Sequence, residues 1–289
     1  MNILIFTKAT LDGACSALFI KWLYNRKIED FAVVEATETN ILNEVNIRQR
    51  NFDHYDKIFV LGLCLTRDQI KEIDKHSLIV VDHQFAHTLL LDNYNKSKII
   101  IEQSTSCISL LYSKFKSVID VNTEQELLIK YVDDYDSFNL KYSDSFKLSA
   151  IFFTYNNPKV VKFIESFENG MRKYTIQEKN AIKIYIRKFK EQLDNTVNFG
   201  TIKNYKTVAI FANTLINNIA HYIISKHNSE IGIVVNLDTK SVSFRRCIHC
   251  DIDVSILAKT FCEGSGTMCA AGGKLTPEFA NLIKDFKPC

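Results

Sequence analysis

The sequence of 289 residues lacks the features that mark several classes of protein. No apolar run approaches the roughly 20 residues needed to cross a bilayer, which excludes a helical membrane protein. The net charge is only +3, so a large basic surface for long duplex nucleic acid is excluded as well. The first residues, MNILIF, lack a basic leader and resemble a strand rather than a signal peptide. We therefore expect a soluble cytoplasmic protein with no membrane partner.

Cysteine is plentiful, but its eight copies are scattered along the chain. Only Cys247 and Cys250 have the spacing of zinc ligands, and they would need partners such as Cys262 or Cys269. Because no second closely spaced pair exists, zinc binding is the less favoured interpretation. The cysteines in the first half of the chain have apolar neighbours, which predicts buried thiols in a reducing cytoplasm.

The length of the chain and its strand-like segments predict two α/β domains. In the first half, the predicted strands cover residues 2–6, 31–35, 55–62, 78–81 and 98–101. Helical patterns separate these runs, and such alternation is typical of a doubly wound parallel sheet.

The second half begins with a long charged amphipathic segment, which predicts a connecting helix at residues 175–195. The strands predicted after it cover residues 207–211, 231–236 and 240–245, and a helix is predicted at 253–261. We therefore divide the chain into a first domain at 1–174, a linker at 175–204 and a smaller α/β domain at 205–289.

Polar residues follow two of the predicted strands. Asp82, His83 and Gln84 come directly after the strand at 78–81, and Asp12 lies between the first strand and the helix after it. Ligands and metals collect at the carboxyl ends of strands in open α/β sheets, and an Asp with a His offers oxygen and nitrogen ligands for Mn, Zn or Fe. The alternatives are a turn with a structural histidine and, for Asp12, a helix N-cap.

Two further segments are candidates for a binding site. Three carboxylates lie among aromatic residues in the segment YVDDYDSF, at 131–138, and form either an enclosed acidic site or a solvated face. Residues 264–273, GSGTMCAAGG, predict a small-residue loop and the start of a helix. Small residues let backbone N–H groups approach a phosphate, and Arg245 could add a bidentate contact. The alternative is a tight turn with close helix packing.

In this order, the motifs resemble the DHH phosphoesterase superfamily, which includes RecJ-like exonucleases, nanoRNases, pAp phosphatases and cyclic-dinucleotide phosphodiesterases. The first motif of the family, a His followed by Asp-x-Asp-Gly, matches the segment from Lys8 to Gly13, and the Asp of its second motif falls at Gly62. The triplet that names the family matches residues 82–84. The Asp of the fourth motif matches Asp134, with Asp136 as the other candidate. SFRR, DVSILAKTF and GSGTMCAAGG resemble the C-terminal DHH-associated domain, and the resemblance implies a cleft between the two domains.

The resemblance also implies which residues form the site. The family holds two metals, but three ligand positions are occupied here by Lys8, Thr10 and Gly62. The remaining set implies one divalent metal, Mn or Mg, or none, with the ligands Asp12, His83 and Asp134. The residues expected to be catalytic are Asp12, His83 and Asp82. The residues expected to contact substrate are Lys8, Gln84, Arg245, Gly264, Ser265, Gly266 and Thr267.

These replacements predict a protein that binds a short oligonucleotide, dinucleotide or nucleotide phosphate in the interdomain cleft, with hydrolysis weakened or lost. Lys8 could preserve attraction for a phosphate without activating water. The alternative is an active phosphodiesterase that uses a single metal, and a third interpretation is a scaffold for protein contacts. Exposed strand edges leave a homodimer open.

Overall fold

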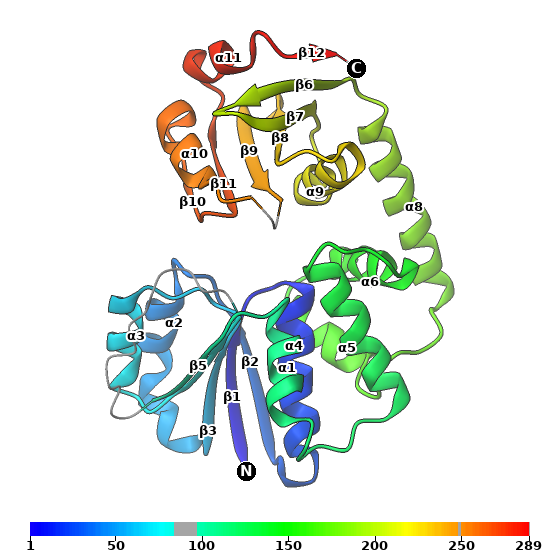
Figure 1. The fold of residues 1–289 in the computed structure, drawn as a ribbon. Coiled ribbons are helices and arrows are strands. Elements are labelled where there is room, and N and C mark those ends of the chain that lie inside the picture. Colours follow the sequence, from blue (N-terminus) through cyan, green and yellow to red (C-terminus); the bar gives the residue numbers. More distant parts are fainter. Residues whose placement is uncertain (84–96, 248–249, 289) are drawn as a thin grey trace. The chain divides into compact units, whose positions relative to one another are not determined.

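The computed structural model describes residues 1–83, 97–247 and 250–288 (Figure 1). The chain divides into two compact units, Met1–Ile182 and Lys183–Cys289. Among the described residues, no helix is both long enough and apolar enough to span a membrane.

The first unit is built on five parallel strands in the order β2-β1-β3-β4-β5. The strands are β1 (Asn2–Thr7), β2 (Asp30–Glu35), β3 (Lys57–Leu61), β4 (Ile79–Asp82) and β5 (Lys98–Ile101). Their apolar runs are nearly continuous because helices cover both faces of the sheet. The predicted doubly wound parallel sheet is confirmed.

Helices α1 (Leu11–Tyr24) and α4 (Cys107–Phe115) cover one face of this sheet, and α2 (Ile41–Arg48) and α3 (Arg67–Asp74) cover the other (Figure 1). Three further helices form an outer layer in contact with α1: α5 (Thr123–Asp136), α6 (Ser143–Thr154) and α7 (Lys159–Ser166). Short 3₁₀ turns follow α1 and α2 at η1 (Asn25–Lys27) and η2 (Gln49–His54).

The strand order places a topological switch point at the carboxyl ends of β1 and β3. From β1 the chain moves to β2 on one side and returns to β3 on the other, so the connections after β1 and β3 leave the sheet in different directions. Such a switch point is where open α/β sheets bind ligands. Lys8 and Gly62 directly follow these strands, and His83 follows the adjacent β4.

The second unit contains a mixed sheet in the order β10-β11-β9-β8-β7-β6-β12. The strands are β6 (Val197–Ile202), β7 (Tyr205–Phe211), β8 (Ile231–Asn236), β9 (Ser241–Arg246), β10 (Ser265–Gly266), β11 (Ala270–Lys274) and β12 (Lys287–Pro288). Helices α9 (Ile216–His227) and α10 (Val254–Cys262) lie on opposite faces of the sheet (Figure 1). Phe279 of α11 (Pro277–Ile283) packs edge-on against Phe244, at 5.9 Å between ring centroids.

Two parts of the second unit differ from the sequence prediction. The long helix α8 (Ile176–Leu193) ends early enough for β6 to form within the predicted linker. The sequence did not predict β6, because glycine is uncommon within strands and Gly200 lies inside this one. The missing side chain of Gly200 leaves room for the Phe286 ring. The expected helix start in the glycine-rich segment is wrong, because Ala270–Lys274 forms β11 in an antiparallel hairpin with β10.

Close backbone packing explains the glycines of this hairpin. A Cβ atom on Gly264 would lie 2.2 Å from the carbonyl oxygen of Gly272. We expect Gly264→Ala to lower the free energy of unfolding of the second unit by about 1–3 kcal/mol, the usual cost of overpacking. The exposed neighbour Ser265 provides the control, and Ser265→Ala should change stability by less than about 0.5 kcal/mol. Urea titrations followed by fluorescence would measure both, and equal stabilities would contradict the packing role.

Candidate metal and phosphate site

Three side chains from separate parts of the first unit converge at the carboxyl end of the sheet. Asp12, His83 and Asp136 each offer a ligand atom, and the three atoms lie within 4.8 Å of one another. Asp12 comes from the first turn of α1, His83 follows β4, and Asp136 is the last residue of α5. The Nε2 atom of His83 lies 3.8 Å from a carboxylate oxygen of Asp136.

Asp12 is not the N-cap of α1, and its carboxylate is instead held by the neighbouring helix α4. Thr10 is the N-cap of α1, where its side chain accepts a hydrogen bond from the Gly13 amide. The two carboxylate oxygens of Asp12 accept hydrogen bonds from the amides of Cys107 and Ile108, at 3.1 and 2.9 Å, at the start of α4. Burial raises the pKa of Asp12 to about 6, although these two amides favour the charged form.

His83 has the properties of a nitrogen ligand. Its burial lowers the pKa of the ring, despite the nearby charge of Asp82, so the imidazole is neutral at pH 7. The Nδ1 atom lies 3.6 Å from an oxygen of the buried Asp82, while Nε2 faces Asp136. A carboxylate beside the second ring nitrogen is the usual means of orienting a metal-binding histidine. Asp82 therefore fits an orienting role, and its predicted catalytic role stays a prediction.

The structure brings Asp136 to His83, whereas the sequence resemblance favoured Asp134 and gave Asp136 as the other candidate. The carboxylate of Asp134 accepts hydrogen bonds from the amides of Lys141 and Tyr142, at 3.0 and 3.1 Å, and from the Ser145 hydroxyl at 2.6 Å. These contacts tie down the segment between α5 and α6. Asp134 is thus occupied in a structural role.

The acidic segment 131–138 is half-buried: Asp134 is buried, whereas Asp133 and Asp136 are partly exposed. Its remaining carboxylate, Asp133, accepts hydrogen bonds from the hydroxyls of Thr105 and Ser106 at 2.5 and 2.6 Å. Burial and the charge of Asp12 raise the pKa of the Asp136 carboxyl well above its usual range. Two adjacent carboxylates resist full ionisation until a cation joins them. Together with a neutral imidazole, they fit one divalent metal ion.

Lys8 forms an ion pair with Glu38, a residue that carries no sequence motif. Glu38 lies between β2 and α2, and its carboxylate also accepts a hydrogen bond from the Cys64 amide at 3.3 Å. The charge of Lys8 also acts on all three converging residues, where it lowers each pKa. Lys8 therefore adds positive charge beside the site, but Glu38 neutralises much of it.

Gly62 is the position at which the sequence resemblance predicts a bridging aspartate. Its φ angle of +63° is in the left-handed region, which glycine adopts without strain. A Cβ atom there would lie 3.7 Å from a carboxylate oxygen of Asp12 and 3.5 Å from the Cβ atom of Cys107. The position therefore borders the site and has room for a Cβ atom, but it supplies no ligand.

In the second unit, Arg245 lies on β9 and is held by neighbouring polar groups. Its guanidinium donates to the Phe244 carbonyl at 2.7 Å and to the side chain of Asn217 in α9. His221, one turn further along α9, has its pKa lowered to about 3 by burial and by the charge of Arg245. Sequence reasoning missed Asn217 and His221, because neither has a recognisable spacing to Arg245.

The predicted phosphate loop is a closed hairpin turn. The Thr267 amide donates to the Ala270 carbonyl at 2.8 Å, and the Ala270 amide donates to the Thr267 hydroxyl at 3.2 Å. The Gly264 amide is likewise bonded to the Ala258 carbonyl at 3.0 Å. The tight-turn alternative accounts for this segment. Substrate contacts by the set from Gly264 to Thr267 stay a prediction, and Gln84 lies outside the described residues.

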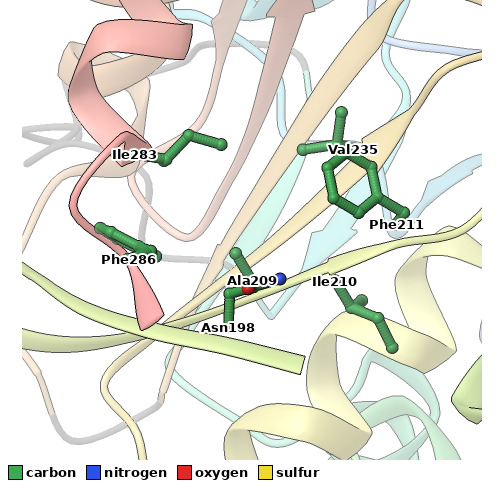
Figure 2. A pocket seen from close by; sticks show the side chains of 7 residues that line it. All are labelled: Asn198, Ala209, Ile210, Phe211, Val235, Ile283 and Phe286. Carbon is green, nitrogen blue, oxygen red and sulfur yellow. The ribbon is translucent and has the colours of Figure 1, made fainter. Parts of the chain in front are cut away.

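Two other regions of the second unit contain no predicted site residue. An apolar pocket lies between the sheet and the C-terminal segment, with Asn198 as its one polar lining side chain (Figure 2). Within the described parts of the chain, Cys247 and Cys250 join no group of three potential metal ligands.

Comparison with solved structures identifies the fold. The chain is similar to the pGpG-specific phosphodiesterase PggH from Vibrio cholerae, with a TM-score of 0.59 and 14% identity over 98% of this chain and 96% of that one. It is also similar to manganese-bound exonuclease RecJ, with a TM-score of 0.57 and 9% identity over 98% and 88% of the two chains. A DHH domain from a member of the s1p family of ribosomal proteins gives a TM-score of 0.51 and 13% identity over 99% and 87%.

These likenesses confirm the DHH fold that the sequence motifs implied. No family model and no curated protein sequence matches the chain.

The geometry predicts different results for two neighbouring aspartates. Asp136→Asn should weaken Mn²⁺ binding by at least about tenfold, since even outer-shell partners of a metal are worth that much. Asp134→Asn should instead lower the free energy of unfolding by about 1–3 kcal/mol, because it disturbs a buried acceptor. Calorimetric titration with Mn²⁺ and urea denaturation would separate the two effects. Stronger loss of Mn²⁺ affinity in the Asp134 variant would contradict the assignment.

Metal affinity should also depend on pH. Asp12 holds a proton below a pH of about 6 and must release it to bind a cation. We therefore expect Mn²⁺ affinity to rise as the pH increases from 5 to 7, with proton release in the lower half of that range. Calorimetry in buffers of different ionisation enthalpy would measure the released protons. An affinity that is constant across this range would be inconsistent with Asp12 as a ligand.

Proposed function

We propose that this chain binds a short oligonucleotide, dinucleotide or other nucleotide phosphate, and that it hydrolyses such a ligand weakly or not at all. The observation that carries this proposal is Gly62. Its backbone faces Asp12 at the place of the bridging ligand, but it offers no carboxylate. The similarity to a pGpG phosphodiesterase and to RecJ supports the class of ligand.

A single metal is the cofactor that the first unit fits. Asp12, His83 and Asp136 would hold it, with Asp82 beside the His83 ring. A divalent cation in this position supplies charge for binding and polarising a phosphate oxygen. The residues of the chain hold the ligand set in place, chiefly through the contacts of Asp12 with α4.

Phosphate contacts are proposed for two cations. Lys8 adds an ammonium beside the three converging residues, and Arg245 presents a guanidinium on the second unit. Arginine suits phosphate because its planar fork makes two parallel hydrogen bonds. A protein with these groups and without efficient turnover would serve to sequester or sense its ligand, or to regulate its level.

The loss of one metal should have a large effect on rate. Two metal ions stabilise both the attacking and the leaving oxygen of an in-line displacement. Each 1.4 kcal/mol lost from transition-state stabilisation lowers the rate about tenfold, so a loss of several kcal/mol corresponds to about 10³-fold or more.

A single-metal phosphodiesterase is the second candidate function. The convergence of Asp12, His83 and Asp136 favours it, because a metal held by this donor set could also activate a water molecule for attack on the phosphate. The two functions differ in turnover and share the same ligands.

The test is hydrolysis and binding of the same ligands under the same conditions. We expect pApA, pAp or a cyclic dinucleotide to bind in calorimetry with Mn²⁺, Mg²⁺ or EDTA, and to remain intact in a parallel product assay. Arg245→Ala should weaken binding by about tenfold, the effect of a lost charged contact. Turnover that disappears in both Asp12→Ala and His83→Ala would establish the single-metal enzyme instead.

Restoring the missing carboxylate provides a gain-of-function prediction. Aspartate tolerates the left-handed backbone of Gly62 better than most residues do. We expect Gly62→Asp to increase Mn²⁺ affinity on the order of tenfold and to raise hydrolysis of pApA above the wild-type level. Gly62→Ala is the matched control, since it imposes backbone strain without a ligand. If both variants behave alike in calorimetry and product assays, the missing bridge is not the reason for weak turnover.

A further inference from the structure

Two cysteines beyond the end of β9 lie in contact with each other. Cys247 directly follows the last residue of β9, and the Cys250 amide donates a hydrogen bond to the Cys247 carbonyl at 3.5 Å. The sulfur of Cys250 lies 3.6 Å from the same carbonyl oxygen, so this thiol points back toward Cys247. A backbone hydrogen bond between residues three positions apart brings their Cα atoms within about 7 Å, which is also the limit for a disulfide without backbone movement.

Neighbouring groups hold both residues in this arrangement. The Cys247 amide donates to the Glu230 carbonyl at 2.8 Å, and the Cys250 sulfur lies 3.5 Å from the same carbonyl oxygen. The guanidinium of Arg246 donates to the Cys250 carbonyl. Both cysteine side chains pack against the hydrophobic core that includes Leu257 of α10. These contacts keep the two residues close together before any bond between them forms.

The two thiols differ in their access to solvent. Cys250 is buried, whereas Cys247 is partly exposed. Burial and a hydrogen bond with the Cys247 side chain raise the pKa of the Cys250 thiol. Because the thiolate is the attacking species in thiol–disulfide exchange, the accessible Cys247 meets an oxidant first and the buried Cys250 reacts second.

We propose that Cys247 and Cys250 form a reversible disulfide, which makes the segment after β9 a site of thiol oxidation. The oxidant is a small disulfide such as oxidised glutathione. The Cys247 thiolate attacks one of its sulfurs, forms a mixed disulfide and releases one glutathione thiolate. The Cys250 thiolate then attacks the Cys247 sulfur and releases the second. The two cysteines are oxidised, and the two glutathione thiolates take up the protons that the cysteines lost. This proposal does not depend on the proposed function.

Cys269 lies near the same segment but in a different environment. It is exposed, and its sulfur lies 3.3 Å from both the Nε and the Nη2 atoms of Arg246. The Cys269 sulfur thus contacts a guanidinium, whereas the Cys250 thiol contacts Cys247. We therefore expect Cys269 to form a mixed disulfide with glutathione and no bond within the chain.

Mass spectrometry of the full chain tests the proposal. The reduced protein would be incubated with oxidised glutathione, treated with an alkylating reagent and digested with trypsin. Cleavage after Arg246 and Lys259 places Cys247 and Cys250 in one peptide and Cys269 in the next. We expect the first peptide to lose two hydrogen atoms and to resist alkylation until a reductant restores both thiols.

Three variants separate the steps of the reaction. Cys250→Ser should accumulate glutathione on Cys247, because the second attack is no longer possible. Cys247→Ser should leave the buried Cys250 unmodified. Cys269→Ser is the matched control and should form the disulfide as the wild type does. Circular dichroism would show that each variant keeps its fold.

Two results for the wild type would overturn the proposal. One is a first peptide that keeps both thiols free for alkylation after incubation with oxidised glutathione. The other is a disulfide that joins Cys247 or Cys250 to the peptide of Cys269. Both results come from the unmodified chain, so they do not depend on whether the variants fold.

Discussion

The buried carboxylate of Asp12 is the group on which the candidate site depends. It joins α1, which follows β1, to the first two amides of α4, and it does so at the carboxyl end of the parallel sheet. The start of a helix stabilises an anion through unpaired N–H groups and the helix dipole. This stabilisation opposes the effect of burial, which still raises the pKa of the Asp12 carboxyl to about 6. One oxygen of the same carboxylate lies within 4.8 Å of ligand atoms of His83 and Asp136, so the contact that joins the helices also places a metal ligand.

Charge balance is the second constraint on the site. Asp12, Asp82, Asp133 and Asp136 bring negative charge to one region, while the charge of Lys8 is shared with Glu38. Such a region repels a phosphate until protons or a cation reduce its charge. The residues therefore favour cation binding even though Gly62 and Lys8 have removed much of what a second metal would require. This combination supports the proposal that the chain binds a nucleotide phosphate without efficient two-metal chemistry.

Much of this architecture could be predicted from the sequence, because parallel strands buried on both faces leave continuous apolar runs. Asp12 and His83 could also be predicted as site residues, because ligands collect at the ends of such strands. The sequence could not decide between Asp134 and Asp136. Asp134 and Asp136 are two positions apart on α5, so their side chains point in directions that differ by about 200° around the helix axis. Only the packing of α5 decides which of them faces His83. The contact between Glu38 and Lys8 could not be predicted, because Glu38 lies in a loop with no sequence periodicity. The small residues of the β10–β11 hairpin are equally typical of tight turns and of anion-binding loops, so the sequence could not decide between them.

A single-turnover assay tests the central claim most directly, because it requires only one chemical event per protein molecule. The protein would be held in excess over labelled pApA with saturating Mn²⁺, after calorimetry has shown that the ligand is bound. The account predicts that bound pApA stays intact, or is cleaved at a rate about 10³-fold or more below that of a two-metal DHH enzyme under the same conditions. Cleavage at a comparable rate that Asp12→Ala and His83→Ala each abolish would contradict the account and establish an efficient single-metal phosphodiesterase.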